Sequence, residues 1–359
     1  MKLPFRDLDE AAARVMRNGG EALRGRSILL TGGTGFIGRW IIESFCRINA
    51  AHDLRALMAI LTRDPERFRA SAPHLPADPA LTVVEGDLRS LALGRSIPAP
   101  QHCDAVIHGA TETSNTLACD PRAFLATIEG TRDALEFAVR TRARRFLYLS
   151  SGMVYGRQPR DLSHIPEDFA GAPDTLDPES AYGETKRDGE LLCASYAKQF
   201  GLEVVIARGF AFIGPHLPLD RNFAAGNFLR DALNEAPIRI RGDGTPLRSY
   251  LYAADLAWWL WVLLLKGAPG RAYNVGSENA VSIAELARET AGLVQPPPPV
   301  TIAGVPDPGR APERYVPSTA RARSELALEE TVDWRTALRK TYEWHRESRM
   351  AEAPARSAG

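Results

Sequence analysis

The sequence predicts an α/β fold in which a doubly wound parallel sheet is covered by helices on both faces. Short apolar stretches, each long enough for one strand, alternate along the chain with longer stretches of helical spacing. The short stretches are apolar throughout, which indicates strands buried on both faces. In addition, the first strand, Ile28–Leu30, runs directly into a glycine-rich turn that is followed by helical spacing from Trp40. Because ligands bind at the carboxyl ends of the strands in such folds, we expect the functional residues there.

The glycine-rich turn, residues 31–38, has the sequence Thr-Gly-Gly-Thr-Gly-Phe-Ile-Gly. A strand, a glycine-rich turn and a helix in this order form the pyrophosphate-binding element of Rossmann-type dinucleotide domains. The free N–H groups and the dipole at the helix N-terminus attract the anion. The alternative is a flexible turn without a ligand, and the flanking strand and helix favour the first interpretation. The residues of the turn predicted to bind a cofactor are Gly32, Gly35, Phe36, Ile37 and Gly38.

Further strands and helices are predicted along the chain from apolar runs and helical spacing. Residues 1–24 are predicted to form an appended helix, with Asp7 or Asp9 as its N-cap and Gly19-Gly20 as its end. The apolar run 256–265 is only half as long as a membrane span of about 20 residues, so we expect a buried helix there. The other strands are predicted at 57–62, 81–87, 104–110, 145–150 and 203–208, and the clearest helices at 122–140 and 181–200.

The composition bounds the class of protein. The chain has 359 residues, of which 45% are hydrophobic and 25% charged, and its formal net charge is zero. A neutral chain without basic clusters argues against nucleic acid as the main partner, and the length of its apolar runs argues against a membrane partner. The cysteines are scattered without metal-ligand spacing, so we predict no metal site and free thiols in a reducing cytoplasm for Cys46, Cys103, Cys119 and Cys193.

The end of the second strand bears on the choice between NAD and NADP. A carboxylate there would bind the adenosine ribose hydroxyls, whereas a basic residue suits a 2′-phosphate. Arg63 favours NADP if the strand ends at Thr62, and Asp64 leaves NAD open if it turns inward. A third interpretation is an exposed Arg–Asp pair without a ligand. After the third strand, Asp87 and Leu88 are placed to contact the adenine, although Asp is also common in turns.

Residues 150–186 carry the predicted chemistry. Ser151 follows the fifth strand, and Tyr182 and Lys186 lie four residues apart at the start of the next helix and therefore on one face. A tyrosine, with a reference pKa of about 10, is a poor base at neutral pH, and a nearby ammonium lowers that pKa by favouring the phenolate. Tyr182 can then exchange a proton with a substrate oxygen that Ser151 orients, while Lys186 can also hold the nicotinamide ribose. The alternative is a surface pair, since this spacing recurs by chance.

With these motifs in order, the chain resembles the extended short-chain dehydrogenase/reductase family, also called the NAD-dependent epimerase/dehydratase family, which acts mainly on nucleotide sugars. The resemblance implies a Rossmann domain at 25–215, to which 250–276 returns, and a smaller C-terminal substrate-binding lid at 216–249 and 277–345. Residues 1–24 would be a helical extension and 346–359 a disordered tail. The matching residues are TGGTGFIG at 31–38, Gly86-Asp87-Leu88, SSGMVYG at 150–156, Tyr182 with Lys186, RSYLYAAD at 248–255 and YNVG at 273–276.

The same resemblance implies roles for individual residues. Ser151, Tyr182 and Lys186 would form the catalytic triad, and the glycine turn with Asp87 would hold the cofactor. Arginines suit a diphosphate because their donors bind it in pairs, with a structural ion pair as the alternative for each of them. For Glu112, a helix-capping role is the alternative to contact with the sugar. The residues assigned to the substrate are Glu112, Asn227, Arg248 and Arg310.

Departures from the family pattern narrow the reaction. Members that remove water across C5 and C6 of the sugar usually carry Asp and Glu where this chain has Gly152 and Met153, which cannot transfer protons. Sugar-acid decarboxylases usually place a Glu near Met153. The asparagine that many members carry three residues after Arg208 is replaced by Ala211, which puts the diphosphate contacts in doubt.

We therefore favour an epimerase that acts through a transient 4-keto sugar. The first alternative is an NADPH-dependent reductase of a nucleotide keto-sugar. A less favoured alternative is an unusual dehydratase or decarboxylase. A cofactor-binding regulator without turnover should have lost Tyr182 or Lys186, and both are present. The resemblance further implies NAD as cofactor, with NADP as the alternative, and a homodimer that packs the helices near 122–140 and 181–200 into a four-helix bundle.

Overall fold

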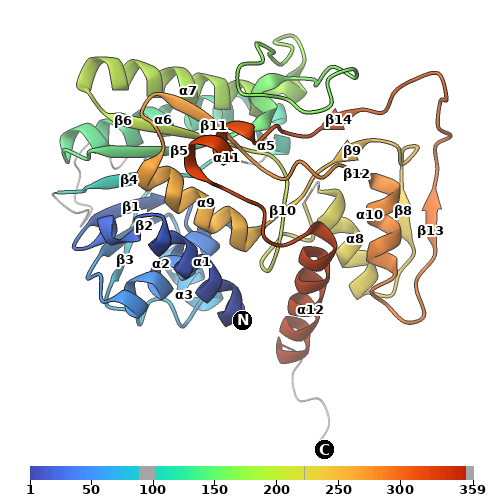
Figure 1. Cartoon of the computed structure of the whole chain (residues 1–359), viewed down its shortest axis with the longest axis horizontal. Helices are drawn as coiled ribbons and strands as arrows, with labels where there is room; N and C mark the ends of the chain where they lie inside the picture. The colour runs from blue at the N-terminus through green and yellow to red at the C-terminus, as the bar shows by residue number, and fades with distance from the viewer. Residues whose placement is uncertain (89–101, 113, 222, 353–359) are drawn as a thin grey trace, which may run out of the picture.

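Seven parallel strands form the central sheet in the computed structural model, which describes residues 1–88, 102–112, 114–221 and 223–352. The strands lie in the order β11-β6-β5-β4-β1-β2-β3, and every neighbouring pair is parallel (Figure 1). The chain order changes direction between β1 and β4, where such sheets leave a crevice for a ligand. This arrangement confirms the predicted doubly wound sheet. The strands are β1 (Ser27–Thr31), β2 (Leu57–Thr62), β3 (Leu81–Glu85), β4 (Ala105–His108), β5 (Arg145–Ser151), β6 (Glu203–Gly209) and β11 (Arg271–Val275).

Helices cover both faces of the sheet. Ile28 and Leu30 of β1 belong to a core that includes residues of α1, α2, α3, α9 and α11, whereas Leu29 belongs to a second core with α6 and α7. Successive side chains of a strand alternate between faces, so one buried apolar strand supplies both cores. The helices of the first face are α1 (Phe5–Arg17), α2 (Phe36–His52), α3 (Pro65–Ser71), α9 (Ala253–Lys266) and α11 (Ala320–Leu326); α5 (Ser114–Cys119) lies beside α6 (Pro121–Arg140) and α7 (Ala181–Phe200).

The most apolar run of the chain is a buried helix, as predicted. Residues 253–264 of α9 are all buried, including Trp258, Trp259 and Trp261. The helix packs between α1, α2 and the strands β5 and β6. Within the described ranges, no helix combines the length and apolar character needed to cross a membrane.

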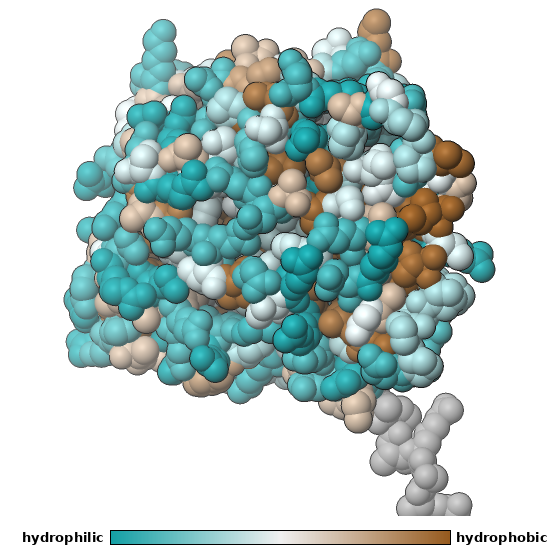
Figure 2. Space-filling model, turned by 45° about the vertical axis from the view of Figure 1, so that its right-hand side comes forward, coloured by the Kyte–Doolittle hydropathy of each residue, from teal (hydrophilic) through white to brown (hydrophobic). Residues whose placement is uncertain are grey.

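A separate core beside the sheet is built mainly from the C-terminal part of the chain and also includes Leu3, Leu8 and Trp40 (Figure 1). Its largest elements are α8 (Ala224–Leu233), α10 (Ile283–Ala291) and α12 (Trp334–Glu352). Figure 2 brings the right-hand side of Figure 1 forward. The surface that it shows is mostly hydrophilic, with hydrophobic residues in separate groups. The remaining elements are the short strands β7 (Phe212–Ile213), β8 (Ile238–Ile240), β9 (Leu247–Arg248), β10 (Leu251–Tyr252), β12 (Val281–Ser282), β13 (Val300–Ile302) and β14 (Arg314–Tyr315), and the 3-10 helices η1 (Gly20–Leu23), η2 (Gly152–Tyr155) and η3 (Pro178–Ser180).

Two expectations about the chain ends need correction. Pro4, not Asp7 or Asp9, is the N-cap of α1, because Asp7 lies within the first turn, where its carboxylate is buried against Tyr252 and Lys340. The helix does end before Gly19, whose φ is +95°. At the other end, α12 continues to Glu352, so residues 346–352 are helical, and 353–359 lie outside the described residues.

Candidate active site

The glycine turn forms an open cradle at the carboxyl end of β1. Gly32 has φ +75°, and a Cβ there would lie 2.6 Å from the carbonyl carbon of Gly109. A Cβ at Gly38 would lie 2.4 Å from the oxygen of Gly32, so glycine is needed for α2 to reach the turn. At Gly35, by contrast, the nearest atom to a Cβ is the Gly32 oxygen at 3.6 Å, and no side chain caps the N-terminus of α2. The turn therefore fits a pyrophosphate against free N–H groups.

A buried chain of hydrogen bonds supports the cradle from behind. The Thr31 hydroxyl lies 2.8 Å from Nδ1 of His108, and Nε2 of His108 lies 3.2 Å from the Thr131 hydroxyl. Thr31 also accepts hydrogen bonds from the backbone N–H groups of Gly109 and Ala110. Burial, together with the charge of Lys186, lowers the pKa of His108 to about 3, so its ring is neutral. We assign His108 to the support of the turn.

The end of β2 presents Arg63 to solvent. The strand ends at Thr62, and Asp64 caps α3 by accepting a hydrogen bond from the N–H of Arg67 at 2.9 Å. The Asp64 carboxylate is therefore engaged locally, whereas the Arg63 side chain is 76% exposed and pairs with Glu112 at 3.4 Å. Glu112, predicted to contact the sugar, thus lies with Arg63 at the cofactor side of the crevice.

The loop after β3 contains the two residues predicted to contact the adenine. Leu88 packs toward α6, where a Cβ at Gly130 would lie 2.6 Å from its Cδ1. Asp87 is half-buried beside it. The Leu88 side chain thus packs against α6, shortly after the carboxyl end of β3.

Ser151, Tyr182 and Lys186 come together where β5 meets the start of α7. The Ser151 oxygen accepts the N–H of Met153 at 3.2 Å, and the Tyr182 side chain lies close to Ser151. Nζ of Lys186 donates to the carbonyl of Leu149 at 2.9 Å and lies 5.9 Å from the centre of the Tyr182 ring. Burial lowers the pKa of Lys186 to about 8. Burial also raises the pKa of Tyr182, and the nearby Ser151 opposes that rise.

Tyr315 is a fourth member of this group that the sequence did not indicate. Its strand, β14, runs parallel to β9, and Tyr315 stands opposite Arg248 in the register. Burial raises the pKa of Tyr315, and the nearby Ser151 opposes that rise. A strand of two residues has no periodicity to reveal it, and Tyr315 is far from Ser151 in the chain. The only local signal was an Arg-Tyr pair after a proline-rich loop.

Phe210 fills the space beside Gly152. A Cβ at Gly152 would lie 2.7 Å from Cζ of Phe210, and the Phe210 ring is 4.7 Å from the ring of Tyr315. The neighbouring Met153 is 41% exposed. Beside the first position after Ser151 lies the ring of Phe210, and the second position carries the exposed thioether of Met153. Neither group exchanges protons.

The predicted substrate residues lie in different surroundings. Arg248 is half-buried and shares the register position of Tyr315, so both belong to the same face of the small sheet. In α8, the Asn227 side-chain oxygen accepts a hydrogen bond from Arg230 at 3.1 Å. Arg310 is exposed in a turn closed by its N–H to Asp307. Beside Tyr315, Nε of Arg314 is buried without a hydrogen-bond partner in the described structure, and sequence reasoning had not singled it out.

Other residues of the sequence motifs form a network behind the triad. Arg208 binds both carboxylate oxygens of Glu190, at 3.0 and 2.7 Å, and donates to the Tyr155 hydroxyl at 2.8 Å. Tyr155 in turn donates to Asn274 of β11 at 2.8 Å. Ser150 completes the set by donating to Glu190 at 2.6 Å. These side chains tie β5, β6, β11 and α7 together and are engaged with one another.

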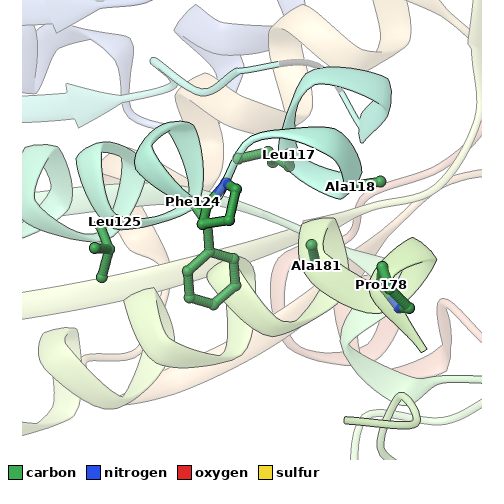
Figure 3. A pocket seen from close by; sticks show the side chains of 7 residues that line it. Leu117, Ala118, Phe124, Leu125, Pro178 and Ala181 are labelled. Carbon is green, nitrogen blue, oxygen red and sulfur yellow. The ribbon is translucent and has the colours of Figure 1, made fainter. Parts of the chain in front are cut away.

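An apolar cavity of about 380 Å³ lies beside the first turn of α7 (Figure 3). Its lining side chains offer no hydrogen-bonding groups, which a sugar or a diphosphate would require. We therefore do not assign the substrate to it. The lining residues are Leu117, Ala118, Pro121, Phe124, Leu125, Pro178 and Ala181.

The chain belongs to the NAD dependent epimerase/dehydratase family, whose model matches residues 28–276. It is 28% identical over 329 residues to a trifunctional UDP-glucose 4,6-dehydratase/3,5-epimerase/reductase of Arabidopsis thaliana, covering 90% of this chain and 48% of that protein. The chain thus spans about half the length of the first curated relatives it matches. It is also 27% identical to a dTDP-glucose 4,6-dehydratase of Streptomyces antibioticus, over 90% of this chain and 93% of the relative.

Solved structures agree with this assignment. An epimerase of Methanothermobacter thermautotrophicus matches with a TM-score of 0.76 and 26% identity, covering 94% of this chain and 96% of that one. A dTDP-glucose 4,6-dehydratase of Streptomyces venezuelae, solved with NAD bound, matches with a TM-score of 0.75 and 25% identity, covering 90% and 98%. The family resemblance and the Rossmann-type fold predicted from the sequence are both confirmed.

Proposed function

We propose that this chain is an NAD-dependent nucleotide-sugar epimerase that inverts a sugar hydroxyl through a transient 4-keto sugar. One observation carries the proposal. The site assembles one proton-exchanging phenol, one hydroxyl and one ammonium, while Phe210 fills the space at Gly152 where an added side chain would stand. Oxidation and reduction at a single carbon need only such a set, whereas elimination of water needs a second acid and base. Glu112, the carboxylate assigned to the sugar, pairs with Arg63.

The chain's own residues supply the cofactor site and the proton chemistry. The glycine turn would hold the pyrophosphate, Asp87 and the backbone at Leu88 the adenosine, and Lys186 the nicotinamide ribose. Bound there, NAD would supply the hydride acceptor and donor for the sugar carbon. Tyr182 takes the proton of the sugar hydroxyl and later gives it back, Ser151 orients the same oxygen, and the Lys186 ammonium favours the phenolate.

A nucleotide sugar also brings a diphosphate, for which the chain offers Arg248. The guanidinium lies on the same face as Tyr315, so it would bind the diphosphate at a short distance from the reacting sugar. We propose Asn227 for the nucleotide base and Arg310 for the outer phosphate, as expected from the resemblance. Arg230 holds the Asn227 amide in place, and Arg310 is exposed and would have to turn inward.

A second candidate is an NADPH-dependent reductase of a nucleotide keto-sugar. The observation that favours it is the end of β2, where Arg63 extends from the sheet while Asp64 is occupied as a helix cap. An arginine there suits a 2′-phosphate. Against it stand the solved relatives that hold NAD. A dehydratase is favoured by the names of several relatives, but the site lacks an acid and base at residues 152 and 153.

The products formed from nucleotide sugars test the proposal. The chain is incubated with NAD⁺ and a panel of UDP- and dTDP-linked hexoses and uronic acids, and the products are followed by NMR. We expect an equilibrium mixture of two epimers with at least one substrate, without loss of water, and a decrease of about 10²-fold or more in rate for Tyr182→Phe. A 4-keto-6-deoxy product would instead identify a dehydratase. The control is Tyr196→Phe, which removes an α7 hydroxyl that bonds Glu136 of α6.

A further inference from the structure

An ion pair connects the two strands that flank the glycine turn. Nη1 of Arg63 donates to Oε1 of Glu112 at 3.4 Å. Arg63 directly follows β2, whereas Glu112 lies shortly after His108, the last residue of β4. In the sheet, β1 lies between β4 and β2, and it leads into the glycine turn (Figure 1). The pair therefore spans the carboxyl end of β1, where a dinucleotide binds in this type of sheet.

The position after β2 bears on the choice of dinucleotide. In Rossmann-type folds a carboxylate there binds the ribose hydroxyls of NAD, whereas an arginine accommodates the 2′-phosphate of NADP. This chain has Arg63 at that position. The next residue, Asp64, is engaged as the cap of α3, where its carboxylate accepts the N–H of Arg67 at 2.9 Å. By itself, the end of β2 would therefore favour NADP.

Glu112 changes the charge that a dinucleotide meets at this position. Its carboxylate pairs with the guanidinium of Arg63, so the positive charge is offset where a 2′-phosphate would bind. A 2′-phosphate would have to displace Glu112 from Arg63, and the two negative groups would repel each other. The ribose hydroxyl of NAD carries no charge and meets neither obstacle. A carboxylate that follows β4 thus replaces the one that is absent after β2.

The exposure of the pair indicates that it adjusts the choice and does not block the crevice. The Arg63 side chain is 76% exposed and the Glu112 side chain 37%. Exposed ion pairs are weak and are screened by salt, so Arg63 can exchange one anionic partner for another. Removal of the Glu112 charge would therefore leave the guanidinium free to bind a phosphate.

We propose that Glu112 is a specificity-determining residue that selects NAD over NADP by engaging the Arg63 guanidinium. The inference rests on the dinucleotide site of the proposed function, and it assigns Glu112 to the cofactor instead of the sugar. It also reconciles an arginine after β2 with NAD, the dinucleotide bound in the solved dehydratase of Streptomyces venezuelae.

The experiment is a competition between the two dinucleotides for the full chain. The protein is dialysed against equal concentrations of NAD⁺ and NADP⁺ until the bound ratio is constant, and the bound dinucleotides are released by denaturation and quantified by mass. We expect the wild type to hold mainly NAD. In Glu112→Gln, the ratio of bound NADP to bound NAD should rise by about tenfold, because the freed arginine gains a charge-assisted contact with the 2′-phosphate.

Two further variants show whether the effect passes through Arg63. In an Arg63→Met background, Glu112→Gln should change the ratio by about twofold or less, because there is no guanidinium to release. Glu66→Gln is the matched control and should leave the ratio unchanged, since it removes a carboxylate from another exposed pair, with Arg69 on α3.

Three results would overturn the proposal: a wild type that holds mainly NADP, an unchanged ratio in Glu112→Gln, or an equal gain without Arg63. A gain of the same size in Glu66→Gln would also overturn it, because any nearby negative charge would then suffice. The competition needs no substrate, so failure of the chain to convert any nucleotide sugar would refute the proposed function separately.

Discussion

Lys186 is a buried cation that donates a hydrogen bond to the carbonyl of Leu149 at 2.9 Å. Its pKa of about 8, lowered by burial from the ordinary 10.5, means that the folded protein gives up this proton more readily than the unfolded chain. Between these two values the unfolded state binds more protons, so stability increases as pH rises. The ammonium that supports the Tyr182 phenolate is therefore maintained at a cost to folding.

We predict that Lys186→Met abolishes this pH dependence. Between about pH 7.5 and about pH 9.5, the free energy of unfolding of the wild type should rise by about 2 kcal/mol relative to Lys186→Met. Urea unfolding of both proteins at the two pH values measures the difference. The variant should also lose about 10²-fold or more in turnover. A wild type and a variant with parallel pH profiles would show that Lys186 is not a titrating buried cation.

At the scale of single residues, the site residues that could be predicted from the sequence are those that lie close together in the chain. The glycine turn and the Tyr182–Lys186 pair are local patterns, and each requirement on them can be stated without knowing the rest of the fold. Tyr315 and Phe210 could not be predicted in this way, because they reach Ser151 only through the pairing of β14 with β9 and the path of the chain after β6. The choice between Arg63 and Asp64 depended on a helix cap that forms only when α3 begins at Pro65.

At the scale of elements, the N-terminal helix α1 is fixed to the body of the protein by a buried carboxylate. Asp7, 3% exposed, accepts a hydrogen bond from the Tyr252 hydroxyl at 2.5 Å and pairs with Lys340 of α12. One residue of α1 thus joins the segment before α9 to the C-terminal helix. The sequence indicated the helix but gave Asp7 the role of a cap, because caps and buried carboxylates use the same residue types.

We predict that Asp7→Ala destabilises the fold by about 3 kcal/mol, since it leaves the Lys340 ammonium and the Tyr252 hydroxyl without their partner. Asp9→Ala is the matched control on the same helix. Asp9 is 45% exposed and pairs with Arg47, so its loss should cost about 1 kcal/mol or less. Urea unfolding measures both. If the two substitutions cost the same, α1 is not held through Asp7.

At the scale of the whole molecule, the site lies where two cores meet. The central sheet leads into the glycine turn and supplies Ser151, and α7 supplies Tyr182 and Lys186. The short strands β9 and β14 supply Arg248 and Tyr315. The division into a dinucleotide-binding domain and a lid stays a prediction, as does the homodimer. Exposed apolar side chains on α6 and α7, such as Leu125 and Leu191 at 58% and 68%, are what a bundle between two copies would cover.

The central claim is a redox-neutral cycle, in which the dinucleotide is regenerated within each turnover. The most direct measurement is to denature the purified chain and to identify any released dinucleotide by mass and absorbance. We predict NAD in an amount close to one per chain, because a cofactor that is restored in every cycle has no need to exchange. An empty site, or one that holds readily exchanged NADPH, would contradict the epimerase and would assign Arg63 to the 2′-phosphate of a reductase's cofactor.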